Sequence, residues 1–130
     1  MIVNGGANVL VGSGGNDILT GNGGADTFLY APDPNFGGDL GGGDIITDFV
    51  HGTDKIDVSA IDSGDSDVGD FTFNGLTPTA NGIWYTESGG NTILHFDTDD
   101  APGTVGTPDD EMTLTLVGTS LGLTAADFVL

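Results

Sequence analysis

Carboxylate and amide side chains recur at a fixed interval near the start of this chain. Three nine-residue units fill positions 3–29, and their sixth places hold Asn8, Asp17 and Asp26. Carboxylate and carbonyl oxygens are the hard ligands that Ca²⁺ prefers in proteins. The composition and spacing of these units therefore predict calcium binding at successive turns of the chain.

The other places of each unit indicate how the turns are held. The third and fourth places are glycines, which reach positive φ in tight turns, and the eighth places hold Leu10, Leu19 and Phe28. In short extended segments neighbouring side chains face opposite sides, so these three should stack inward. A nonapeptide repeat of this kind is typical of a parallel β-roll. The alternative, a flexible glycine-rich linker, gives no reason to hold acidic and apolar residues in one phase.

Two degenerate copies follow an insertion at positions 31–38 that contains two prolines. Positions 42–46 and 52–56 match the fourth to eighth places, with Asp44 and Asp54 in the sixth. We interpret both as further turns of the roll. The alternative is that Asp44 and Asp54 are exposed turn carboxylates, since Asp is common in turns.

Because successive turns of a roll lie on opposite edges, a cation should lie between each turn and its next but one. This pairs Asp17 with Asp44 and Asp26 with Asp54. A third, weaker site is expected between the turns of Asn8 and Asp26, since Asn8 offers a neutral oxygen. The expected ligands, side-chain or backbone oxygens, come from Asn4, Gly6, Asn8, Gly12, Gly14, Asn16, Asp17, Gly21, Gly23, Ala25, Asp26, Asp44 and Asp54.

The charge balance favours cations as partners. Twenty Asp and Glu residues stand against one basic residue, Lys55, which gives a formal net charge of -19 over 130 residues. Such a chain cannot neutralise phosphates, so we expect neither nucleic acid nor anionic lipid as a partner. No apolar run is long enough to span a membrane, and we expect no stable membrane insertion. The glycine-rich turns are followed by Asp and by no P-loop lysine, which excludes a phosphate loop.

The second half lacks the glycine pattern and contains ordinary strand signals. Positions 71–73, 83–86, 92–96 and 112–117 are β-branched and aromatic, and positions 88–91 form a hairpin turn signal. We expect an all-β fold: a parallel β-roll over residues 1–57, then a small antiparallel β-sheet or sandwich over residues 58–130 that caps the roll. At this length the two parts should fold as one cooperative unit.

Four segments resemble the C-terminal RTX domain of serralysin-type secreted metalloproteases. They are the stretches 25–28, 44–49 and 54–61, and the terminus 121–130, where an Asp precedes apolar residues at the very end. The resemblance implies a calcium-binding module that supports folding and export of an upstream effector, such as a metalloprotease, through a type I ABC exporter. It also implies a secreted protein. Met1 directly before a repeat favours the C-terminal piece of a longer chain, and Thr124 with Asp127 forms a capping-box-like pair.

Calcium affinity and charge together suggest a folding switch. Extracellular calcium modules bind with Kd of about 10⁻⁴ to 10⁻³ M, so cytosolic calcium would leave such sites empty. The chain contains no cysteine, and so no disulfide or thiolate metal site. We expect self-repulsion to keep the chain loose inside the cell and calcium to order it outside.

No catalytic signature is present. The zinc motif His-Glu-x-x-His is absent, and the two histidines, His51 and His95, are isolated in sequence and expected to be structural. The acidic stretch 97–111 lacks the EF-hand framework and is expected to be a solvated loop. We therefore expect a non-catalytic module.

A carbohydrate-binding or adhesion module of a polysaccharide-modifying enzyme is the alternative. Trp84 and Tyr85 are adjacent on one expected strand, so one of them should face outward and could stack on a sugar. The opposing interpretation is that Trp84 is buried in the core. An acidic polysaccharide would be repelled unless calcium bridged the two.

Overall fold

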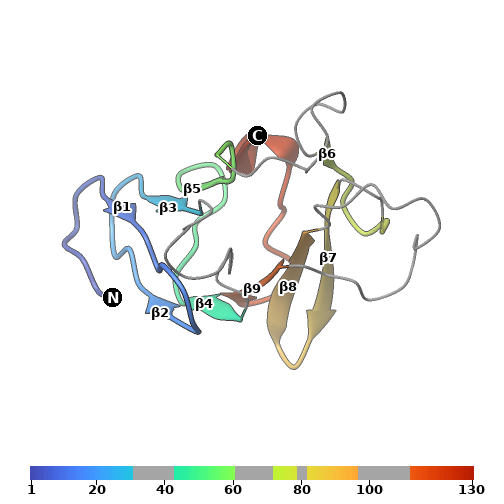
Figure 1. Ribbon diagram of the computed structural model, residues 1–130, viewed down its shortest axis with the longest axis horizontal. Coiled ribbons are helices and arrows are strands. Elements are labelled where there is room, and N and C mark those ends of the chain that lie inside the picture. The colour runs from blue at the N-terminus through green and yellow to red at the C-terminus, as the bar shows by residue number, and fades with distance from the viewer. Residues whose placement is uncertain (31–42, 61–71, 79–81, 97–111) are drawn as a thin grey trace.

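The computed structural model describes residues 1–30, 43–60, 72–78, 82–96 and 112–130. The insertion at 31–38 and the acidic stretch at 97–111 lie outside these residues. Figure 1 shows short strands of the repeat region on one side of the molecule and a longer hairpin, β7 with β8, on the other. Within the described segments, no helix is long and apolar enough to cross a membrane.

One sheet has four parallel strands in the order β1-β3-β5-β10. Leu10, Phe28, Ile56 and Phe128 are successive partners in its register. Its strands are β1 (Val9–Leu10), β3 (Thr27–Leu29), β5 (Lys55–Asp57) and β10 (Phe128–Val129).

The other sheet has six strands in the order β2-β4-β9-β8-β7-β6. The pairings β2–β4 and β4–β9 are parallel, β9–β8 and β8–β7 are antiparallel, and β6 is parallel to β7. Its strands are β2 (Ile18–Leu19), β4 (Asp44–Ile46), β9 (Met112–Val117), β8 (Asn91–Phe96), β7 (Gly82–Ser88) and β6 (Thr72–Phe73).

The strands of the repeats alternate between the two sheets, as a β-roll requires. The eighth-place residues Leu10, Leu19 and Phe28 are fully buried and belong to one hydrophobic core. Burial of each such side chain contributes about 1.5–3 kcal/mol. The prediction of inward stacking is confirmed, and the degenerate copies form β4 and β5 as expected.

The antiparallel arrangement of β7, β8 and β9 confirms the predicted all-β second half. The second half does more than pack against the end of the roll, because two of its strands hydrogen-bond to roll strands. β9 continues the sheet of β2 and β4, and β10 continues the sheet of β1, β3 and β5. The short 3₁₀ helix η2 (Ala125–Asp127) delivers the chain into β10. The C-terminal end therefore lies beside β5, at one edge of the four-stranded sheet (Figure 1).

Candidate metal centre

The turns of the roll form two edges. We call the edge with the turns before β1, β3 and β5 the first edge; its sixth places are Asn8, Asp26 and Asp54. The second edge carries the turns before β2 and β4, with Asp17 and Asp44 in the sixth places. Each side chain is placed by a tight glycine turn and by a following buried strand residue.

A hydrogen bond of one kind joins neighbouring turns on both edges. The backbone N–H of Asp17 donates to Oδ1 of Asp44 at 2.8 Å, and that of Asp26 donates to Oδ1 of Asp54 at 3.0 Å. The N–H of Asn8 donates to Oδ1 of Asp26 at 2.9 Å. The structure thus brings together the residues that the sequence paired.

These carboxylates are buried, not solvated. Asp44 is 0% exposed and Asp54 is 2% exposed, so the alternative of exposed turn carboxylates is wrong. Oδ2 of Asp17 and Oδ2 of Asp26 are buried without a hydrogen-bond partner. Taking a carboxylate out of water costs several kcal/mol unless an opposite charge offsets it. Buried carboxylate oxygens without a hydrogen-bond donor, found at both edges, fit the binding of a cation.

Gly12 lies beside one oxygen of Asp17 and one of Asp44. A Cβ at Gly12 would lie 2.7 Å from Oδ2 of Asp44 and 3.3 Å from Oδ2 of Asp17. The two oxygens are therefore close to one point of the second edge that only a glycine leaves open. The bare glycine backbone keeps space beside both carboxylates.

Tyr30 places a hydroxyl group beside the second edge. Its side chain is buried, and burial, followed by the negative charge of Asp44, raises the pKa of Tyr30 far above its ordinary value. The phenol therefore stays neutral. The negative charge of this edge therefore belongs to the carboxylates alone. A bound cation would offset that charge.

Asp54 on the first edge differs from its counterpart on the second. Oδ1 of Asp54 accepts the N–H of Asp26, and Oδ2 accepts the N–H of Val50 at 2.8 Å. Both oxygens are satisfied by the backbone. In the turn of Asp26, a Cβ at Gly21 would lie 2.4 Å from Oδ2 of Asp26, so this glycine too leaves a carboxylate its space.

The remaining predicted ligands lie in the turns as expected. Asn16 faces the next turn of its edge, with Oδ1 2.8 Å from the position of a Cβ at Gly43. Gly14 lies in the turn before β2, and Gly23 and Ala25 lie in the turn before β3. Among the described residues no three Asp, Glu or His side chains converge on one point. A cation here would have to take backbone carbonyl oxygens as well.

Two further acidic residues bind the turns, and the sequence predicted neither of these contacts. Asp48 accepts the N–H of Gly21 at 2.9 Å and that of Asn22 at 2.6 Å. A signal existed, since Asp48 lies in the segment that resembles the serralysin-type domains.

Asp127 is the second, and it closes the first edge at the C-terminal end. Its buried carboxylate accepts the N–H of Gly52 at 2.9 Å, that of Thr124 at 2.8 Å, and a hydrogen bond with Nδ1 of His51 at 2.7 Å. Burial acts to raise the pKa of Asp127, but the bonds from Gly52, Thr124 and His51 outweigh it and lower that pKa. The capping interaction of Thr124 with Asp127 is confirmed. His51 is not isolated, because it joins this pair.

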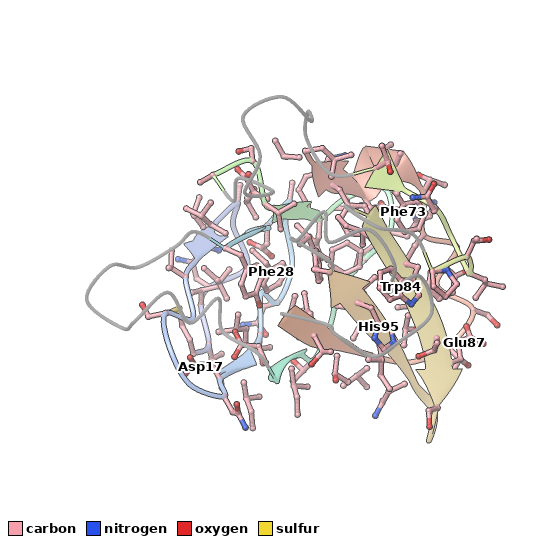
Figure 2. The ribbon with its side chains drawn as sticks, turned by 45° about the vertical axis from the view of Figure 1, so that its right-hand side comes forward. Asp17, Phe28, Phe73, Trp84, Glu87 and His95 are labelled. Atoms are coloured by element: carbon pink, nitrogen blue, oxygen red, sulfur yellow. The ribbon has the colours of Figure 1, made fainter. Side chains whose placement is uncertain are left out.

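The aromatic pair of the predicted binding alternative is divided between the two faces of β7. Trp84 is 8% exposed, and its ring stacks on that of His95 at 5.4 Å (Figure 2). Nε2 of His95 lies 2.9 Å from the Thr86 hydroxyl, so this histidine too is held in place. Tyr85 packs against the core and stacks on Phe73 at 6.2 Å. The interpretation that Trp84 is buried is confirmed.

Comparison with known proteins agrees with this geometry. The model of the family described as peptidase M10 serralysin C terminal matches residues 4–130. The chain belongs to this serralysin C-terminal family. The RTX-type repeats at its N-terminal end are thereby confirmed, and no match was found among curated proteins.

A solved structure from outside the peptidases is also similar to this serralysin C-terminal chain. It is the solution structure of the AlgE6R3 subunit from the Azotobacter vinelandii mannuronan C5-epimerase, with a TM-score of 0.53 and 28% sequence identity. The match covers 95% of this chain and 66% of that one. The same all-β architecture thus accompanies two different enzymes.

Proposed function

We propose that this chain is a calcium-binding, non-catalytic RTX module that orders when Ca²⁺ binds between the turns of its roll. The observation that carries the proposal is the orphaned, buried Oδ2 of Asp17, which lies with an oxygen of Asp44 beside the same point at Gly12. An anionic oxygen buried without a donor calls for a cation. Two carboxylates and surrounding carbonyl oxygens form the hard ligand set that suits Ca²⁺.

The residues present fit calcium at the second edge. Asp17 and Asp44 would supply carboxylate oxygens, and backbone oxygens of the turns that contain Gly12, Gly14 and Asn16 would supply the rest. When bound, the ion neutralises charge that otherwise opposes folding of a chain with net charge -19. The chain's own residues form the turns, exclude water and hold the carboxylates. On the first edge, Asp26 provides the corresponding orphaned oxygen.

The module is proposed to be the secreted C-terminal part of a longer protein. The family assignment supports an upstream peptidase or other effector, and the C-terminal end, which resembles a type I export signal, would engage an ABC exporter before the roll folds. The roll and the second half would fold as one cooperative unit, because β9 and β10 complete the two sheets of the roll.

Calorimetric titration with Ca²⁺, combined with far-ultraviolet circular dichroism in calcium and in EGTA, tests the proposal. The expected result is saturable binding and a gain of strand signal on adding calcium. A chain that binds no calcium and has the same spectrum in EGTA would refute it. Export is tested separately by fusing residues 61–130 to a passenger and deleting Asp127 to Leu130, which should abolish secretion.

A carbohydrate-binding module is the second candidate, favoured by the similarity to the subunit of a mannuronan C5-epimerase. A polymer of mannuronate would be repelled by this chain unless calcium bridged the two. Binding to immobilised mannuronan should then require calcium. Equal retention in calcium and in EGTA would refute this candidate, and the buried Trp84 is not expected to contact the polymer.

A further inference from the structure

The side-chain amide of Asn8 lies inside the first gap of the first edge, between the turns before β1 and β3. Its Nδ2 donates to the carbonyl oxygen of Gly6 at 2.5 Å and to that of Asn4 at 2.9 Å. It also lies 3.3 Å from Oδ1 of Asp26, which accepts the backbone N–H of Asn8. Oδ1 of Asn4 lies 3.5 Å away, so four oxygens from two neighbouring turns surround one NH₂ group.

These oxygens are of the kind that a cation would use. Two are turn carbonyls, one is a side-chain amide oxygen and one belongs to a carboxylate. Ca²⁺ binds six to eight such atoms at about 2.3–2.6 Å. The amide carries two N–H donors and cannot lose a proton, so it repels a cation at this place. Calcium could enter only if the amide rotated away and gave up its hydrogen bonds to the carbonyls.

The gap on the second edge contrasts with this one. There the sixth-place residue is Asp17, whose Oδ2 is buried without a donor. Asn8 takes the equivalent sixth place in its unit, and its donor group satisfies the oxygens that surround it. Both gaps have the same hydrogen bond from a sixth-place N–H to the carboxylate of the next turn. They differ because a side-chain NH₂ group lies between the oxygens of the first gap only.

Resting on the calcium-dependent function proposed above, we infer that the Asn8 amide replaces a metal ion in the first gap, which closes without calcium. The first gap is then not a weak third site, as the sequence led us to expect, but a metal-free one. In the folded roll, β1 docks on β3 through this amide and needs no ion in that gap. Calcium dependence belongs to the gaps that contain orphaned carboxylate oxygens.

Asn8→Asp tests the inference, because it replaces the NH₂ group by an oxygen and a negative charge. The variant should bind one more Ca²⁺ than the parent in calorimetric titration. At a calcium concentration that keeps the parent folded but leaves the new site empty, its melting temperature should fall below that of the parent, since the new carboxylate would face that of Asp26 at close range. Asn74→Asp is the matched control: it adds the same charge beside β6, where Asn74 bonds Thr72, and should leave the ion count unchanged.

Asn8→Ala provides a second test in case Asn8→Asp does not fold. It removes the amide and should leave the number of bound calcium ions equal to that of the parent. Loss of one ion in Asn8→Ala, or no gain of an ion in folded Asn8→Asp, would overturn the inference while leaving the proposed function intact. A parent chain that binds no calcium would instead refute the proposed function.

Discussion

The backbone N–H of Asp17 donates to Oδ1 of Asp44, 27 residues later, while Oδ2 of Asp17 is buried without a partner. One carboxylate oxygen thus holds the neighbouring turn, and another is left for a cation. The same division of roles recurs on the first edge between Asp26 and Asp54. Hydrogen bonds from the backbone join the turns, but among the described residues one carboxylate oxygen on each edge has neither a hydrogen-bond donor nor a positive charge beside it.

Asp17→Asn should remove calcium from the second edge. The amide replaces the orphaned anionic oxygen, so affinity at this site should fall at least about tenfold, which corresponds to about 1.4 kcal/mol. Calorimetry measures the change. Asp57→Asn, which neutralises a strand carboxylate bonded to Ser59, is the control and should keep the parent's affinity. Equal affinities in both variants would show that Asp17 is no ligand.

Gly12→Ala should damage the same site by steric means. Its methyl group would lie 2.7 Å from Oδ2 of Asp44, so the carboxylate must move, at a cost of about 1–3 kcal/mol. Gly23→Ala is matched, because its methyl group would meet no atom within 4 Å. Thermal unfolding in calcium should separate the two variants. If both melted at the parent's temperature, the space at Gly12 would have no role in binding.

Calcium removal should destabilise the whole chain, since the roll strands share sheets with β9 and β10. At a calcium concentration about tenfold above Kd, each site contributes about 1.4 kcal/mol to the free energy of unfolding. Trp84 is the single tryptophan and is buried against His95, so its fluorescence reports on the second half. We expect EGTA to shift that fluorescence together with the circular dichroism. A change confined to the circular dichroism would mean that the two parts fold separately.

Asp127→Asn should destabilise the C-terminal end in a pH-dependent way. The folded-state pKa of Asp127 lies below the ordinary value of about 3.9. Its contribution is therefore complete above that ordinary value and is lost as pH falls through the folded-state pKa. Loss of charge-assisted bonds to Gly52, Thr124 and His51 should cost about 1.5–3 kcal/mol near neutral pH.

Urea unfolding of the parent and Asp127→Asn at pH 7 and pH 3 checks this. The difference in unfolding free energy should shrink at the lower pH. A difference that stayed constant, or grew in acid, would mean that the carboxylate's charge does not stabilise the fold.

The nonapeptide pattern predicted the roll well because the same glycine, acidic and apolar places recur in successive units. Asp17 and Asp44 could be paired from the sequence since the period puts them on the same edge, and Leu19 faces inward because strand neighbours alternate. The alternation in Met112–Val117 predicts a strand, yet it fits parallel and antiparallel neighbours equally. The parallel pairing of β9 with β4 depends on contacts far apart in the chain, which no local signal reports.

The roles of Asp127 and Asn8 show a second limit. Asp127 was expected to cap a short helical turn, and it does so, but its bonds to Gly52 and His51 arise only when β10 joins the sheet. The sequence predicted Asn8 to be a weak ligand, because its side chain has an oxygen as that of Asp does, but a neutral one. Which end of the amide meets the carbonyls of Asn4 and Gly6 depends on the folded turn.

The most direct test of calcium binding between the turns is a crystal structure from calcium-containing solution, with anomalous scattering used to identify the ion. The predicted result is a calcium peak beside Gly12, at about 2.3–2.6 Å from Oδ2 of Asp17 and within reach of Asp44. A well-ordered structure with only water at that position, and both carboxylates bonded to the protein alone, would contradict it.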